Sequence, residues 1–229
     1  MSKRKLFLGV IMLINTTIIN AQTFNYGLTL NFGISQVTSN FPISGDYKVK
    51  FTISGNVGGF FEKRIGMRSF IGGEILWIQI EGKEVTNNKV LTAINGQGML
   101  ETVGMISDIS KLHSSYFGLP IYYKINFNKI GIKFGFQTMI FLFANSNYEA
   151  SGKLNGKPFQ NKGETNNIKF DLVDFGPKIG TEYELNSKLN LRADFYLGIP
   201  DITSKSFPWE RRNRQITLGI NYLLTKNKN

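Results

Sequence analysis

Eight segments of the chain alternate apolar residues with polar or small ones at a period of two. In the first of them, Phe24, Tyr26 and Leu28 begin a run of six such alternations, and the last lies just before the C-terminus. A period of two is typical of a β-strand with one apolar and one polar face. The eight segments are 24–35, 51–62, 71–77, 117–127, 131–144, 173–185, 189–197 and 214–224. They predict an all-β protein.

The connections between these segments alternate in length along the chain. Short turns on one side, longer loops on the other and an even number of strands are typical of transmembrane barrels. We expect short turns at 63–68, 128–130 and 186–188, and long loops at 39–50, 81–114, 145–169 and 199–213. We therefore predict a closed, eight-stranded, antiparallel, up-and-down transmembrane β-barrel over residues 22–229.

Charged residues in the eight segments all fall on the polar face. A surface in contact with lipid demands this, because one Lys or Arg at the bilayer midplane costs about 2–4 kcal/mol. An eight-stranded barrel is just wide enough for its own side chains, and buried charges must be paired. We therefore predict a filled lumen that holds an ion-pair network, and no open pore. The charged residues are Glu62, Glu74, Lys124, Lys133, Asp174, Lys178, Glu182, Arg192 and Asp194.

Three details of the strands are less regular. The proline at position 120 removes a ladder hydrogen-bond donor, so a bulge or local defect is expected there. Residues 139–143 are apolar throughout, which leaves their facing open. The long segment 81–114 has no sustained period, and we expect it to be a loop with a short helix over 99–112.

The N-terminus predicts export. Residues 1–21 combine Lys3, Arg4 and Lys5 with an apolar stretch that ends at Ala21, which is typical of a secretory signal peptide. Without this segment the net charge falls from +11 to +8. For an exported protein, anionic lipid headgroups are a better counterpart to this charge than nucleic acid. We expect the protein in the outer membrane, with outer-membrane lipid as its partner.

A secreted, lipocalin-type barrel is the soluble alternative. It would turn the apolar face inward around a ligand and the polar face to water. Three features favour an apolar face that points outward into lipid. The polar face is rich in Gly, Ser, Thr and Asn, the loop lengths alternate by side, and aromatic residues such as Trp77 and Tyr222 lie near strand ends.

Several segments together resemble a known family. These are 116–124 (Y-F-G-L-P-I-Y-Y-K), 170–183 (F-D-L-V-D-F-G-P-K-I-G-T-E-Y) and 195–202 (F-Y-L-G-I-P-D-I), with a signal that ends in Ala21 and Gln22. In this order they resemble the PorT-like outer-membrane β-barrel proteins of Bacteroidota. The resemblance implies an eight-stranded barrel and an accessory role in protein secretion. The segment 217–224 also resembles the C-terminal signal that outer-membrane barrels present to the barrel-assembly machinery.

Little in the sequence predicts chemistry. His113, the only histidine, is followed by two serines near the expected external rim, but nothing places an orienting group or oxyanion donors. Asp174 and Glu182 could form a catalytic carboxylate pair, although an interior ion-pair network explains them better. One histidine and no cysteine argue against zinc. We predict no catalytic residues, no cofactor and no metal.

Protein partners are the remaining expectation. The long segments 81–114 and 145–169 would contact an extracellular partner or ligand. A cluster of basic residues on the side of the short turns would snorkel toward lipid phosphates or meet a periplasmic partner. These residues are Lys63, Arg64, Arg68, Lys129, Lys188, Lys226 and Lys228.

Overall fold

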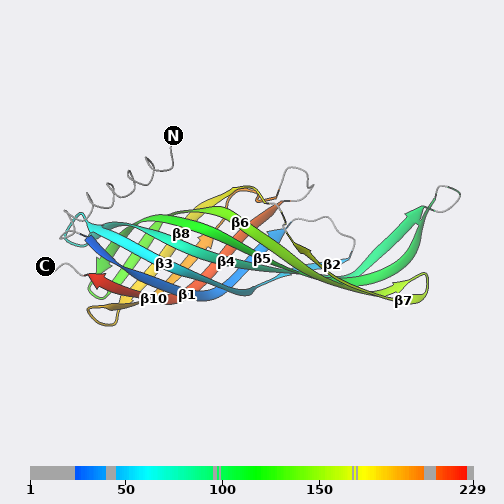
Figure 1. Cartoon of the computed structure of the whole chain (residues 1–229), viewed down its shortest axis with the longest axis horizontal. Helices are drawn as coiled ribbons and strands as arrows, with labels where there is room; N and C mark the ends of the chain where they lie inside the picture. The colour runs from blue at the N-terminus through cyan, green and yellow to red at the C-terminus, as the bar shows by residue number, and fades with distance from the viewer. Residues whose placement is uncertain are drawn as a thin grey trace, which may run out of the picture.

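The computed structural model is an antiparallel sheet that closes on itself (Figure 1). It describes residues 24–39, 45–94, 97, 99–166, 168, 170–203 and 210–225. The strands are β1 (Phe24–Ser39), β2 (Asp46–Lys50), β3 (Thr52–Arg64), β4 (Ser69–Ile94), β5 (Leu100–Phe127), β6 (Ile130–Leu154), β7 (Lys157–Asn166), β8 (Val173–Glu184), β9 (Leu189–Leu197) and β10 (Arg211–Thr225). Within the described residues, no helix is long and apolar enough to cross a membrane.

Eight of these strands form a ring. The order is β1-β3-β4-β5-β6-β8-β9-β10, and β10 returns to β1. The closing pair runs antiparallel from Tyr26↔Thr225 to Ser39↔Arg211. The up-and-down eight-stranded barrel predicted from the alternating segments is confirmed. The start of β1 and the end of β10 lie at the same end of the molecule (Figure 1).

The facing of the strands is also as expected. On β10, Leu218 points outward and is 67% exposed, whereas its neighbour Thr217 is buried. The nine charged residues predicted for the inner face are all buried, from 0% exposure for Asp174 to 7% for Lys178. The outer surface is therefore apolar and the charged side chains of the strands lie inside, which excludes the lipocalin-type alternative.

A bulge decides the facing of the apolar stretch 139–143. The β5–β6 register passes from Tyr116↔Phe141 to Ser115↔Phe143, so Leu142 is an extra residue on β6. Met139 points inward and is fully buried, while Leu142 and Phe143 are both exposed. A bulge of this kind lets two successive residues oppose one on the partner strand.

The expected defect at Pro120 lies on one side of β5. Pro120 pairs with Gln137 of β6 in an unbroken register. Toward β4, the recorded pairs pass from Gly73↔Ile121 to Leu76↔Gly118, and none is formed opposite Pro120. The ladder is interrupted there because proline has no N–H to donate.

Three predicted loops are wrong in part, because they contain strands. The segment 81–114 is the distal half of a hairpin of β4 and β5, paired from Glu81↔His113 out to Ile94↔Leu100, and β5 occupies the stretch where a helix was expected. The segment 145–169 contains the end of β6 and all of β7, and 39–50 contains β2. No period marks these strands because neither face packs on a complete core. Their pairing continues the ladder that the ring begins.

The short turns are confirmed, and polar residues shape two of them. Asn128 adopts a positive φ of 53° in the turn between β5 and β6. In the turn before β9, the Asn186 side chain accepts hydrogen bonds from the backbone N–H groups of Lys188 and Leu189. This is an Asx-type turn, in which the side chain replaces a backbone acceptor. The predicted signal peptide 1–21 and the tail Lys226 and Lys228 lie outside the described residues.

The apolar belt predicts the effect of one added charge. Ile220 lies midway along the outward row of β10, between Tyr222 and Ile216. We expect Ile220→Arg to lower the free energy of unfolding by about 2–4 kcal/mol in lipid vesicles, because the charge would enter the bilayer centre. Urea titration of the folded protein in vesicles measures this. The control is Ile94→Arg, at a position 72% exposed at the far end of β4. An equal loss in both variants would contradict the assignment of the belt.

Candidate functional site

Eight buried charged residues form one connected cluster inside the barrel. It contains four acids and four bases, so it carries no net charge. Every member lies within 4.0 Å of an oppositely charged partner. The polar layer, as we name this cluster, consists of Glu62, Glu74, Lys124, Lys133, Lys178, Glu182, Arg192 and Asp194.

Arg192 is the hub of the polar layer. Its guanidinium donates a hydrogen bond of 2.8 Å to Glu74 and a further one to Asp194. Its other terminal nitrogen donates to the Thr29 hydroxyl at 2.8 Å and to the Asn221 side-chain oxygen at 3.0 Å. Arg192 therefore links β9 with β1, β4 and β10 across the lumen.

Lysines complete the layer on the other side. The Lys124 ammonium donates hydrogen bonds to the carboxylate of Glu62 and, at 3.1 Å, to that of Glu182. Lys133 donates to Glu182 at 2.8 Å, and its ammonium lies 4.9 Å from the centre of the Tyr122 ring. The predicted ion-pair network is confirmed in these contacts.

Asp174 stands apart from the polar layer. Its carboxylate accepts a hydrogen bond of 2.8 Å from the Asn213 side chain, and the described residues provide it with no salt bridge. Glu182 is eight residues further along the same strand, which separates the two carboxyl groups by about 25 Å at the rise of a β-strand. Asp174 and Glu182 are therefore not a catalytic pair.

A second, apolar layer fills the barrel toward the end with the long connections. Leu76, Ile78 and Ile80 of β4 point inward and are no more than 1% exposed. They pack with residues of β1, β5, β6 and β9 and with Phe170 and Ile202, which lie outside the strands. This layer was not predicted from the sequence. The nearly continuous apolar run 75–80 was the available signal, because strands buried on both faces lose their alternation.

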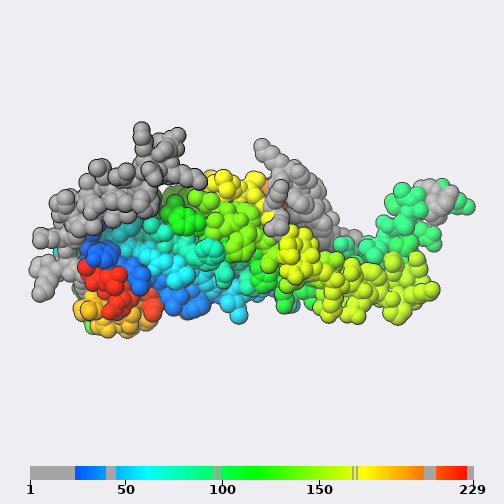
Figure 2. Space-filling model, viewed as in Figure 1, coloured from blue at the N-terminus to red at the C-terminus, as the bar shows by residue number. Residues whose placement is uncertain are grey.

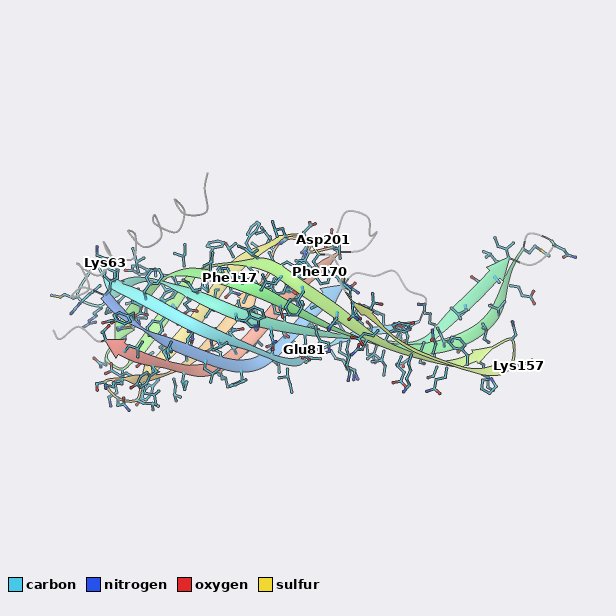
Figure 3. All side chains as sticks on the ribbon, in the orientation of Figure 1. Lys63, Glu81, Phe117, Lys157, Phe170 and Asp201 are labelled. Carbon is cyan, nitrogen blue, oxygen red and sulfur yellow. The ribbon has the colours of Figure 1, made fainter. Side chains whose placement is uncertain are left out.

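A hydrogen-bonded clamp holds the segment that contributes Ile202 to this layer. The Asp201 carboxylate, which is labelled in Figure 3, accepts hydrogen bonds from the backbone N–H and the hydroxyl of Thr203 and from the backbone N–H of Arg211. Partial burial acts to raise the pKa of the Asp201 carboxyl, but the hydrogen bonds from Arg211 and Thr203 outweigh it and lower this pKa below its usual value. This contribution to stability is present at neutral pH and is lost as the pH falls through the lowered pKa.

The two layers occupy the lumen. The acids and bases of the polar layer pair with one another, and the apolar layer packs above them beside buried polar residues such as Gln137 and Asn213. Within the part of the chain that the structure describes, no group of three or more His, Cys, Asp or Glu residues could hold a metal ion. The ion pairs of the polar layer link strands on opposite sides of the barrel, as Arg192 of β9 and Glu74 of β4 do.

His113 lies where the sheet leaves the barrel. Its Nδ1 atom is 3.0 Å from a carboxylate oxygen of Glu81, the residue opposite it on β4. Ser114, the adjacent residue, faces inward and donates its hydroxyl hydrogen bond to the carbonyl of Ile80. Glu81 is an orienting group that the sequence did not reveal, but Ser114 is turned away from the histidine.

A polar depression of about 360 Å³ surrounds His113 on the outer face of the sheet. Glutamine, serine and asparagine side chains from three adjacent strands line it. Figure 3 marks its position by Glu81, at the base of the long projection. We name it the junction depression. It is lined by Gln79, Ile80, Glu81, His113, Ser114, Ser115, Phe143, Asn145 and Asn147.

The predicted basic cluster lies at the end of the short turns. Lys63 is exposed beside Phe24, with its ammonium 5.7 Å from the ring centre. Arg64 donates hydrogen bonds to the carbonyl oxygens of Gly66 and Met67. The described basic residues at this end are Lys63, Arg64, Arg68, Lys129 and Lys188, and all are exposed or partly exposed.

Breaking the polar layer should be costly. We expect Arg192→Met to lower the free energy of unfolding by about 3–5 kcal/mol, because it leaves Glu74 and Asp194 buried with one cation fewer. Urea titration in vesicles measures this loss. The matched control, Lys162→Met, breaks the exposed pair between Lys162 and Glu149 and is expected to leave the unfolding midpoint unchanged. An Arg192→Met variant as stable as the wild type would contradict the role of the hub.

Comparison with known proteins identifies the family of this chain. The family model described as "Outer membrane protein beta-barrel domain" matches residues 20–204. Curated protein sequences yield no match. Among solved structures, the chain is similar to Neisserial surface protein A, with 10% identity, a TM-score of 0.42 and coverage of 86% of this chain and 96% of that one.

Two further solved structures are similar. The attachment invasion locus protein Ail of Yersinia pestis has 8% identity and a TM-score of 0.41, with 88% and 99% of the two chains covered. The outer membrane protease OmpT of Escherichia coli has 7% identity and a TM-score of 0.38, with 88% and 95% covered. Because the family model spans more than half of the sequence, this chain belongs to the family of outer membrane protein beta-barrel domains and resides in the cell outer membrane.

Proposed function

We propose that this protein is a non-enzymatic binding protein that acts through the part of its sheet outside the barrel. We name this part the projecting sheet. It consists of β2, β7, residues 81–94 of β4, 100–113 of β5 and 145–154 of β6. The observation that carries the proposal is its length: β4 and β5 have 26 and 28 residues, whereas β9 has 9.

The projecting sheet reaches far beyond the membrane surface. At about 3.3 Å per residue, 81–94 alone extends for about 45 Å along the strand. Figure 2 shows it as a slender arm that leaves the barrel body at one end. The strands of the arm continue those of the barrel. The β4–β5 pairing crosses from the barrel into the arm without a register shift, from Leu76↔Gly118 to Thr86↔Asp108.

The tip of the arm carries exposed apolar side chains. Ile94, Met99 and Leu100 are 72%, 57% and 75% exposed. The pairing of β2 with β4 ends at Asn87, and among the described residues no strand pairs with 89–94 on that side. An unpaired edge with apolar side chains can accept a strand from another polypeptide. A protein partner at the cell surface fits these features.

The arm needs no chemistry to act in this way. The protein's own side chains occupy the lumen, and the Ser114 hydroxyl next to His113 in the sequence is bonded to the carbonyl of Ile80. These features support a binding role over the alternative of a rim enzyme.

The tip can be tested on intact cells. We expect a photo-crosslinking residue at Ile94 to give a discrete protein adduct, and the same residue at lipid-facing Ile220 to give none. A second chain, in which an Asn-Gly turn replaces 90–105 and joins the paired residues Lys89 and Ile106, should fold and reach the membrane but lose cell-surface partner binding. The proposal fails if no position of the projecting sheet yields an adduct.

The basic end of the barrel favours a second candidate, an accessory role in protein export. Lys63, Arg64 and Lys129 lie at the end of the short turns, which faces the periplasm in outer-membrane barrels. A positive surface there fits an acidic periplasmic partner. Deletion of the gene should then reduce secreted proteins, measured in the culture medium. Unchanged secretion in the deletion strain would dismiss this candidate.

A further inference from the structure

Three chemically distinct zones lie one above another on the outward face of β4, β5 and β6. The first zone is the last apolar row, which contains Trp77 and Phe117, and the Trp77 ring centre is 6.2 Å from that of Phe143. The next two rows form the second zone, the junction depression. In one of them Glu81, His113 and Asn145 are paired across the three strands. The third zone is the row that pairs Lys83 with Lys111.

The junction depression is suited to hydroxyl groups. Gln79, Ser115 and Asn145 supply amide and hydroxyl groups that both donate and accept hydrogen bonds. The Asn145 side-chain oxygen is buried and has no hydrogen-bond partner among the described residues. Glu81 holds Nδ1 of His113, which leaves Nε2 for another contact. A sugar ring presents several hydroxyl groups that match such a set.

The lysine row is suited to an anion. Lys83 and Lys111 are directly opposite on neighbouring strands, and like charges in this position destabilise a sheet. Neither lysine forms a salt bridge with a carboxylate in the described ranges. A phosphate bound between the two ammonium groups would relieve their repulsion.

We propose that this face binds the headgroup of a phosphorylated glycolipid of the outer leaflet. The sugar occupies the junction depression, and its phosphate lies on Lys83 and Lys111. The acyl chains lie along the apolar row of Trp77 and Phe117.

The order of the three zones argues for a membrane lipid. The apolar row continues the lipid-facing belt, so the depression begins where acyl chains end and headgroups start. A free sugar phosphate would use the depression and the lysines but gain nothing from Trp77. This site lies at the base of the projecting sheet and does not depend on a partner at its tip.

The test uses the full mature barrel, folded in detergent micelles and titrated with purified bisphosphorylated lipid A. A lysine near an anionic lipid surface contributes about 1 kcal/mol to the binding free energy. The double variant Lys83→Gln with Lys111→Gln should therefore weaken binding of lipid A about 30-fold. The same variant should bind the dephosphorylated glycolipid as the wild type does. Asn145→Leu should weaken binding of both glycolipids several-fold, because it removes contacts to the sugar.

The matched control is Lys153→Gln with Lys157→Gln, a lysine pair at the β6–β7 turn of the projecting sheet. It should bind lipid A as the wild type does, and heat-modified mobility on gels should show that every variant is folded. Binding of lipid A within twofold of the wild type by the Lys83 and Lys111 variant would overturn the proposal. Equal loss in the control would also overturn it, and so would equally tight binding of phosphatidylglycerol and lipid A.

Discussion

The neutrality of the polar layer is the constraint on which the barrel depends. Every strand of the ring places at least one side chain in this layer or in hydrogen-bond contact with it, including Thr29 of β1 and Asn221 of β10. Four acids and four bases buried without exact partners would cost several kcal/mol for each unpaired ion. The ring therefore has to close in the one register that brings Arg192 to Glu74 across the lumen.

Much of this architecture follows from the sequence, because one physical rule acts on every residue of the membrane-spanning strands. Lipid outside the barrel and a narrow lumen inside it require each strand to alternate apolar and polar residues. The ring, its turns and the nine inward charged residues could therefore be predicted. Which charges meet could not, because partners such as Lys178 and Glu74 are 104 residues apart and depend on the stagger of the closed ring. The apolar layer was missed because inward Ile78 breaks the polar pattern of its face.

The projecting sheet could not be predicted for the opposite reason. Outside the membrane neither face of β4 and β5 needs to be uniformly apolar, so period two fades while pairing continues. The ring acts as a template, since each residue added to the hairpin extends an existing ladder and bears no new nucleation cost. Edge strands are a hazard for association, and β7 is protected by Pro158 and by several charged side chains. Beyond Asn87, the part of the chain that the structure describes provides no such protection on the β4 side of the tip.

The outward face of the barrel changes character along its length, whereas its interior is filled by the polar layer and the apolar layer. The junction depression lies at the boundary between the two environments that shaped the sequence. There the outward face changes from Trp77, which lipid requires, to His113 and Asn145, which lipid would exclude. A ligand with an apolar and a polar part is the kind of molecule that satisfies both sides of this boundary.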